Sequence, residues 1–139
     1  MKKRAALEQA IRRHVDGWCG QPFVWGVSDC LLSICDIIRD ARGYDPAQSF
    51  RGRYRTKIGA LRVTREFGGI EGAIAAMAFD LDWREIAPGE AFVGDVGICA
   101  AGRAGLTGLI KDVQLWVGRN ETAFSAVPSS RVLRAWRIR

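Results

Sequence analysis

The sequence predicts an α+β fold in which helices occupy about residues 1–80 and an antiparallel sheet fills most of about residues 81–139. Two observations support this prediction. Apolar residues recur at helical spacing in the first part of the chain, whereas from about residue 83 they occur in short runs typical of strands. The length of 139 residues suits one domain, residues 1–139, without repeats or linkers. Helices followed by strands in so short a chain indicate an α+β class.

Two helices are expected before residue 45. The first covers about residues 4–17, where apolar side chains recur at helical spacing: Leu7, Ile11, Val15 and Trp18. Asp29 is a favourable N-cap for the second helix, which begins at Cys30 and ends at Gly43. Because residues 30–38 are apolar almost all round, we expect this helix to be buried inside the domain.

Two further helices are expected after a basic loop at residues 44–55. Thr56 is expected to cap a helix that carries Ile58, Leu61 and Phe67. Gly68-Gly69 stops this helix, and a short fourth helix is expected at about residues 70–77.

Strands are expected in the remainder of the chain, at residues 93–100, 112–117, 122–127 and 132–138. Apolar side chains alternate in the second of these segments: Val113, Leu115 and Val117. Arg119-Asn120 is then expected to form a hairpin turn.

The net charge of +6 favours acidic partners such as nucleic acid, an anionic polymer or an acidic protein surface. Much of this charge lies in two arginine-rich stretches, residues 51–65 and 131–139. Neither stretch contains a known nucleic-acid motif, so solvated faces with arginine stems covering apolar surface are the favoured interpretation. No apolar segment approaches the roughly 20 residues that span a membrane. We see no signal peptide and expect a protein made in a bacterial cytoplasm.

Neither a metal nor a cofactor is expected from the four cysteines and the one histidine. The cysteines form no C-x-x-C pair, and one histidine is too few for a typical zinc site. Packing or surface exposure is the favoured role for His14, and burial as small apolar residues for Cys19, Cys35 and Cys99.

Residues 21–30, QPFVWGVSDC, resemble the P-[FY]-x-W-G…D-C motif of NlpC-type cell-wall endopeptidases. These are papain-like cysteine enzymes that cleave peptidoglycan stem peptides. The resemblance implies a papain-like fold with Cys30 in the position of the nucleophile, at the start of the central helix. Residues 88–96 resemble the family's P-G-D-hydrophobic segment that leads into the sheet, and residues 112–118 resemble its H-V-G-I-Y-L-G strand.

The whole pattern is more similar still to a poorly characterised branch of that superfamily, found among the tail genes of phages, prophages and gene transfer agents. Additional matches lie at residues 52–60 and 135–137. The resemblance implies a virion tail or phage-like particle as the location, with other tail proteins, and also peptidoglycan, as the partners.

Two positions depart from the family pattern. Asp112 occupies the place of the catalytic histidine, and Ser125 occupies the place of the third, orienting residue. A papain-type cysteine needs a nearby imidazole, which activates the sulfur and protonates the leaving amine. Loss of such a base typically forfeits about 10²–10⁴-fold in rate. We therefore expect a catalytically silent domain, with Asp112 on the strand that faces the start of the Cys30 helix.

Three functional hypotheses follow from the sequence. The first is a tail-tip or baseplate component with a degenerate papain-like peptidase fold. The second is an active cysteine hydrolase that cleaves peptidoglycan amide bonds with an unconventional base. The third, which is disfavoured, is a nucleic-acid-binding protein that uses the arginine clusters.

The stretch at residues 50–55, FRGRYR, is the expected contact surface for a partner. It alternates arginine with aromatic residues, which are enriched at interface hot spots. Candidate binding residues are Trp25 of the W-G motif together with Arg51, Arg53, Tyr54 and Arg55. The alternative for the tryptophan is core packing.

Overall fold

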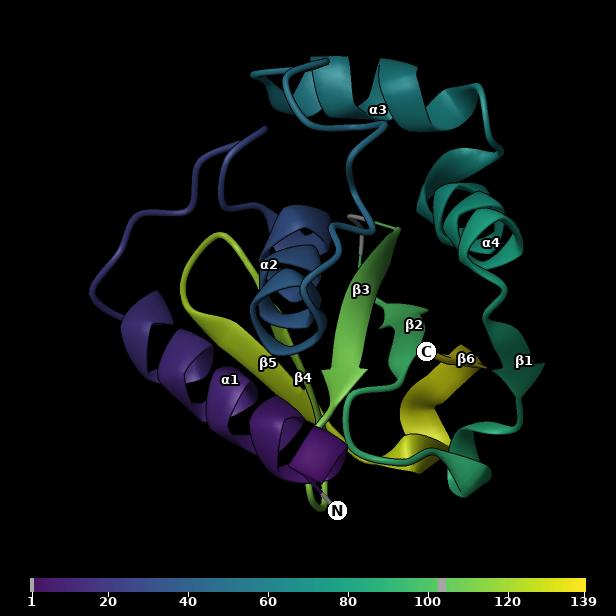
Figure 1. Ribbon diagram of the computed structural model, residues 1–139. Helices are drawn as coiled ribbons and strands as arrows, with labels where there is room; N and C mark the ends of the chain where they lie inside the picture. The colour runs from purple at the N-terminus through teal and green to yellow at the C-terminus, as the bar shows by residue number, and fades with distance from the viewer. Residues whose placement is uncertain (1, 103–104) are drawn as a thin grey trace.

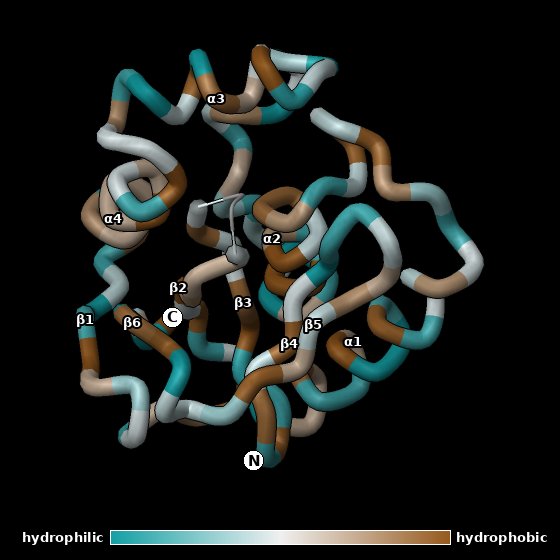
Figure 2. Tube along the Cα trace, turned by 180° about the vertical axis from the view of Figure 1, so that it is seen from behind, coloured by the Kyte–Doolittle hydropathy of each residue, from teal (hydrophilic) through white to brown (hydrophobic). Residues whose placement is uncertain are grey.

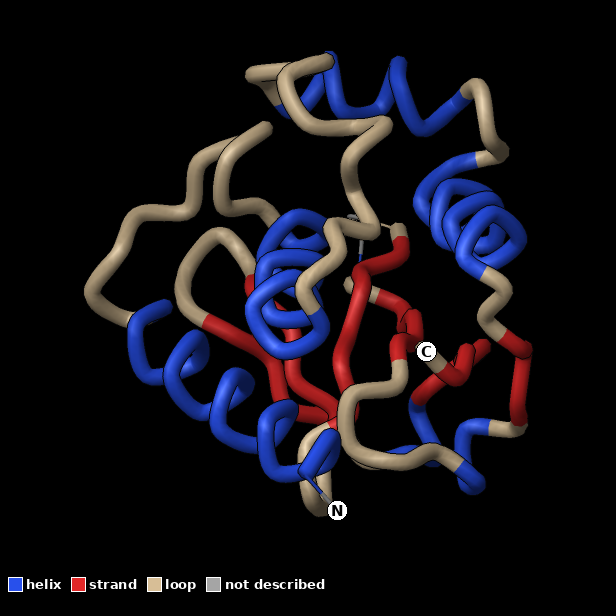
Figure 3. The backbone as a smooth tube through the Cα atoms, viewed as in Figure 1, coloured by secondary structure: helices blue, strands red, loops and turns tan. Residues whose placement is uncertain are grey.

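The computed structural model describes residues 2–102 and 105–139, and within them four α-helices precede a sheet of six strands (Figures 1 and 3). The helices are α1 (Lys2–Trp18), α2 (Cys30–Arg42), α3 (Lys57–Arg65) and α4 (Gly69–Leu81). The expected caps of α2 and the expected start of α3 are confirmed, whereas α3 ends at Arg65, so Phe67, which was expected on this helix, lies beyond it. Asp29 caps α2 by accepting a hydrogen bond from the Leu32 amide at 3.0 Å, and Gly43 ends it with a φ of 81°. Thr56 caps α3.

The strands are β1 (Arg84–Ile86), β2 (Val96–Ala100), β3 (Leu106–Lys111), β4 (Trp116–Arg119), β5 (Phe124–Val127) and β6 (Val132–Arg137). They lie in the order β1-β6-β2-β3-β4-β5, and each pair of neighbours is antiparallel. Short 3₁₀ helices at Pro88–Glu90 and Ser129–Arg131 connect strands. The predicted α+β class with an antiparallel sheet in the second half is therefore confirmed.

The main core lies between the helices and one face of the sheet. Helix α2 packs against β3 and β4, and α1 packs against α2. The predicted burial of α2 is confirmed, since its largest apolar side chains are enclosed: Leu32, Ile34, Ile37 and Ile38. Figure 2 shows hydrophobic residues gathered on α2 and on strands β2 and β3. A smaller cluster, which includes Leu109 and Trp116, lies on the other face of the sheet.

The expected strand at residues 112–117 is wrong in its position. Residues 112–115 form a tight turn, closed by a hydrogen bond of 2.8 Å from the Asp112 amide to the Leu115 carbonyl. The Lys111 ammonium group also donates to the carbonyls of Asp112 and Val113. Strand β4 therefore begins only at Trp116. The strand before this turn, β3, was not expected from the sequence, yet it lies inside the sheet between β2 and β4.

Within residues 2–102 and 105–139, every helix is too short or too polar to cross a lipid bilayer.

Candidate functional site

Cys30, the first residue of α2, lies in the wall of a cavity of about 490 Å³. The cavity opens to solvent and is lined by the loop before α2, by α3 and α4, and by the adjoining ends of β3 and β4. Figure 1 shows α3 at the top of the view, set off from the sheet. Most of the lining is apolar, and its larger side chains are Phe23, Trp25, Leu31, Leu61, Ile70 and Leu106.

The thiol of Cys30 is held in its protonated form by its surroundings. Burial raises the pKa of Cys30, and the neighbouring Asp29 raises it further. Hydrogen bonds with the Gly108 backbone, the Thr107 side chain and the Leu31 backbone act in the opposite direction without offsetting the burial. An activated cysteine nucleophile needs the opposite shift, because the thiolate is the reactive form.

Asp29 connects the W-G loop to α2 and to the following basic loop. Its buried carboxylate accepts hydrogen bonds from the Gly26 amide at 2.9 Å, the Leu32 amide at 3.0 Å and the Tyr54 hydroxyl at 2.6 Å. Burial and the Asp29 carboxylate both raise the pKa of Tyr54. The D-C half of the motif therefore fixes the position of Cys30, whatever the thiol does chemically.

Gly26 is required by the same arrangement. Its φ is 83°, and a Cβ at this position would lie 2.1 Å from the Tyr54 carbonyl oxygen. Gly26→Ala is expected to lower the free energy of unfolding by about 2–3 kcal/mol through backbone strain and overlap. Urea unfolding monitored by tryptophan fluorescence measures this change.

Two other glycines provide matched controls for Gly26→Ala. Gly43 has a φ of 81° with no atom near the added Cβ, so Gly43→Ala isolates the strain of about 1 kcal/mol. Gly20→Ala adds a Cβ 3.9 Å from its nearest neighbour and is expected to change stability by less than about 0.5 kcal/mol. Equal effects of the Gly26 and Gly43 substitutions would show that the overlap with Tyr54 has no role.

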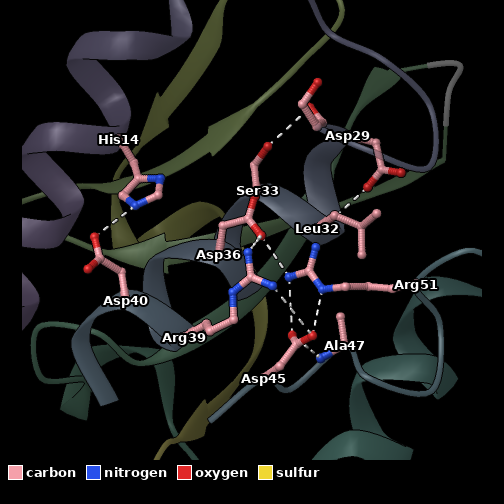
Figure 4. Close-up of polar contacts among 11 residues, drawn as sticks. His14, Asp29, Leu32, Ser33, Asp36, Arg39, Asp40, Asp45, Ala47 and Arg51 are labelled. Atoms are coloured by element: carbon pink, nitrogen blue, oxygen red, sulfur yellow. Dashed lines mark hydrogen bonds and ion pairs between the residues drawn. The ribbon is translucent and has the colours of Figure 1, made fainter. Parts of the chain in front are cut away.

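His14, the one histidine of the chain, lies away from the thiol. Its Nε2 is 3.1 Å from the Asp40 carboxylate, near the C-terminal end of α2 (Figure 4). Hydrogen bonds from Arg13 and then His14 lower the pKa of Asp40. Since Asp40 is ten residues beyond Cys30 on the same helix, the two are about 15 Å apart along its axis. No imidazole therefore contacts the sulfur.

The structure does not bring Asp112 or Ser125 to Cys30, and the expectation that Asp112 faces the start of α2 is wrong. Gly108 is the residue of β3 beside Cys30, since a Cβ on it would lie 3.9 Å from the Cys30 carbonyl oxygen. Asp112 is four residues further along extended chain, about 13 Å away. Ser125 lies on the edge strand β5, where its hydroxyl accepts a hydrogen bond from Asn120 at 3.0 Å. Asp112 was misplaced because the strand beside the thiol was expected at residues 112–117, whereas the strand that lies there is β3.

Sequence reasoning missed three residues at the site. Thr107 and Gly108 contact the thiol from β3, and Arg119 lines the cavity from the end of β4. Three large apolar residues within residues 106–110, Leu106, Leu109 and Ile110, bounded by Gly105 and Lys111, were the available signal for a strand at this position.

The basic loop at residues 50–55 is not a free contact surface at Arg51 or Tyr54. Arg51 donates to Asp45 at 2.6 Å and to Asp36 at 2.7 Å (Figure 4), and the Tyr54 side chain is buried against Asp29. The polar groups of these two residues therefore have partners within the chain, while Tyr54 also lines the cavity. Their predicted role in binding stays a prediction. Arg53 is exposed and pairs with Glu66 at 3.3 Å, and Arg55 is exposed as well.

Trp25, the remaining candidate for binding, does line the cavity. Its ring is half-buried and packs edge-on against Phe23, with ring centroids 5.0 Å apart. Trp25 therefore combines the packing expected of a core aromatic with an accessible position beside Cys30.

The second arginine-rich stretch, residues 131–139, is partly neutralised by acidic side chains. Arg134 pairs with Glu71 at 2.9 Å and with Glu85 at 2.5 Å. Two further pairs join Arg137 to Asp95 and Arg139 to Asp82. This arrangement supports the interpretation of a solvated, ion-paired face over a continuous surface for nucleic acid.

Among the described residues, no three His, Cys, Asp or Glu side chains are grouped so that they could hold a metal ion. No curated protein sequence matches the chain. A family model described as "Domain of unknown function (DUF6950)" matches residues 2–138, almost the whole chain, and the protein belongs to this family.

Proposed function

We propose that this protein is a papain-like domain of the NlpC type whose cavity over Cys30 binds a partner without cleaving it. In this proposal the domain is a component of a phage-type tail, at the tail tip or baseplate. A cysteine at the start of a buried helix that packs on an antiparallel sheet supports the papain-like assignment. The P-F-x-W-G…D-C motif at residues 22–30 supports it as well. The tail location rests on the similarity of the sequence to tail-associated members of that superfamily.

The observation that carries the proposal is a thiol without a base. The pKa of Cys30 is raised, the β3 side chain that acts on the thiol is that of Thr107, and the one imidazole of the chain lies beside Asp40. A threonine hydroxyl cannot take a proton from a thiol at neutral pH, because it is itself a far weaker acid and base than imidazole. The acid–base part of papain-type catalysis is thus missing from the site.

The cavity itself is retained and is suited to binding. A volume of about 490 Å³ with a mainly apolar lining falls in the range of ligand sites. The apolar face expected on α3 remains partly uncovered, since Ile58 is 64% and Leu61 54% exposed, and Leu61 borders the cavity. An apolar cavity whose rim carries exposed apolar side chains is more typical of a docking site than of ordinary core packing.

Hydrolysis and docking are separated by comparing two kinds of variant. Cys30→Ala removes the sulfur and leaves the cavity, whereas Leu106→Trp fills the cavity and leaves the sulfur. We expect neither wild type nor Cys30→Ala to release peptidoglycan fragments above background. In a host that lacks the wild-type gene, we expect Cys30→Ala to support normal tails, as seen by electron microscopy. Leu106→Trp is expected to reduce assembled tails about 10-fold or more, because it blocks the docking cavity.

Val113→Trp is the matched control, because Val113 is 52% exposed in the turn beyond β3 and does not line the cavity. Circular dichroism establishes that each variant is folded before the assembly assay. Fragment release by wild type above Cys30→Ala would establish the hydrolase instead of the docking domain. Normal tails with folded Leu106→Trp would exclude the cavity as the docking site.

A further inference from the structure

Arg119 is a buried cation without an acidic partner. Its side chain is only 2% exposed. Among the described residues the thiol of Cys19, not a carboxylate, is the ionisable group that acts on its pKa. One guanidinium nitrogen, Nη2, donates to the carbonyls of Trp18 and Gln21. Its Nε is sealed from solvent and has no hydrogen-bond partner within residues 2–102 and 105–139. Buried charges in proteins are almost always paired, because desolvation of an isolated ion is costly.

The contacts that Arg119 does make explain only part of its position. Trp18 is the last residue of α1, so its carbonyl lies at the negative end of the helix dipole, which favours a cation. That partial charge amounts to about half an elementary charge, so it does not balance the guanidinium. Nothing in the contact with α1 accounts for an Nε–H group that is left without an acceptor.

Arg119 lies beside the cavity that contains Cys30. In the ladder between β3 and β4, Ile110 is opposite Val117, and continuing this register by two residues places Arg119 opposite Gly108. Gly108 is the residue that contacts the Cys30 thiol. Arg119 also holds Gln21, two residues before Phe23 of the cavity wall. The guanidinium, the thiol and an aromatic side chain therefore border one space.

The charges around the cavity leave this cation available to a ligand. Of the carboxylates that line the cavity, Asp29 is engaged by Gly26, Leu32 and Tyr54, and Glu71 is paired with Arg134. Glu121 is exposed at the surface. Lys57 and Arg65 add positive charge at the rim. An anionic group that enters the cavity would therefore find uncompensated positive charge at its wall.

We infer that the cavity binds the C-terminal end of a partner polypeptide, with the terminal carboxylate on Arg119 and an apolar last side chain against Phe23, Trp25 and Leu106. This inference rests on the proposed docking function and names the chemistry of the docked group. Because Nη2 of Arg119 already donates to Trp18 and Gln21, a carboxylate in the cavity would accept a charge-assisted hydrogen bond from the remaining N–H donors of the guanidinium. In the last residue of a chain, the carboxylate and the side chain are attached to the same α-carbon. A carboxylate beside an apolar side chain matches a single cation within an apolar lining. A segment rich in acidic side chains would be repelled by Glu121 and would place charged groups against the apolar wall.

The test uses the full chain and four synthetic probes in ¹H–¹⁵N NMR titrations. The first pair is acetyl-alanyl-alanyl-leucine with a free carboxylate and the same tripeptide with a C-terminal amide. The second pair is 4-methylpentanoate, which carries the carboxylate and the isobutyl group without a peptide, and its amide. We expect the tripeptide acid to bind about 10-fold or more tightly than its amide. It should also shift the Arg119 Nε–H signal and the backbone signals of Asn120 and Thr107.

Two variants assign the effect to Arg119. Arg119→Gln is expected to abolish the preference for the acid, and Arg119→Lys to retain part of it, because lysine keeps the charge without the planar guanidinium. Arg55→Gln removes an exposed arginine that does not line the cavity and is expected to change nothing. If Arg119→Gln fails to fold, the comparison of acid with amide on wild-type protein still decides the question.

Several results would overturn the inference. Equal affinity for acid and amide, no binding of any probe, or shifts confined to residues outside the cavity would each do so. Equal binding of 4-methylpentanoate and the tripeptide acid would identify a free small acid, not a chain terminus, as the occupant. Failure of the proposed docking function would be recognised separately, as peptidoglycan cleavage that depends on Cys30. Such cleavage can occur with or without a preference for carboxylates.

Discussion

Replacing Asp29 with alanine is expected to lower the free energy of unfolding by about 3–5 kcal/mol. The carboxylate is 1% exposed and accepts hydrogen bonds from Gly26, Leu32 and Tyr54. Loss of the helix cap costs about 1 kcal/mol, and each buried donor left without an acceptor costs about 1–3 kcal/mol. Urea denaturation measured by circular dichroism and by tryptophan fluorescence gives the change.

Tyr54→Phe is the matched control for this prediction. It removes one donor and leaves the cap and the Gly26 contact, so the expected loss is about 1 kcal/mol. In a double-mutant cycle, the effects of Asp29→Ala and Tyr54→Phe should be strongly non-additive, because the two side chains share one hydrogen bond of 2.6 Å. A loss below about 1 kcal/mol for Asp29→Ala would show that water replaces the carboxylate and that the motif is not a structural unit.

The helical half could be predicted from the sequence because its signals are local. Asp29 and Thr56 lie next to the amides that they cap, and Gly43 adopts the left-handed backbone conformation that commonly ends a helix. The apolar pattern of α2 likewise indicated burial, whichever partners the helix has. These features depend on neighbours within a few residues, so no knowledge of the tertiary structure was needed.

The order of the strands could not be predicted in the same way. Residues 112–117 alternate as a strand does, yet Val113 is 52% and Leu115 42% exposed in a turn. The strand that lies beside Cys30 contains Gly108, whose missing side chain lets Ile34 of α2 approach. A Cβ there would lie 3.1 Å from the Ile34 side chain, a close approach that only the packed structure reveals.

Long-range pairing also decided the roles of the arginines. Arg51 lies between Asp36 of α2 and Asp45 of the following loop, carboxylates that are fifteen and six residues away in the chain. A sequence pattern of alternating arginine and aromatic residues does not distinguish this internal network from an interface. Arg119 was expected in a hairpin turn, but it is the last residue of β4 and is buried beside the cavity.

The position of Thr107 leads to the second prediction of large effect, a gain of thiol reactivity in Thr107→His. In wild type, burial and Asp29 raise the pKa of Cys30, so we expect iodoacetamide to label it at least about 10-fold more slowly than the exposed Cys19 at pH 7.5. Peptide mapping by mass spectrometry resolves the two sites within one reaction. Because only the thiolate reacts, the wild-type rate at Cys30 should rise with pH and continue to rise above the ordinary titration range of a thiol.

Thr107→His places an imidazole at the position whose side chain already acts on the pKa of the thiol. A protonated imidazole stabilises the thiolate, and each unit by which the pKa of Cys30 falls increases the thiolate fraction about 10-fold at neutral pH. We therefore expect Cys30 labelling at pH 7.5 to accelerate by about 10-fold or more, with the difference from wild type vanishing at pH values above both thiol pKa values. Asp112→His is the control, because that position lies about 13 Å along the chain from Gly108, and the added imidazole should leave the Cys30 rate unchanged. Faster labelling in Asp112→His, or an unchanged rate in Thr107→His, would show that β3 does not present residue 107 to the sulfur and that the site has been placed on the wrong strand.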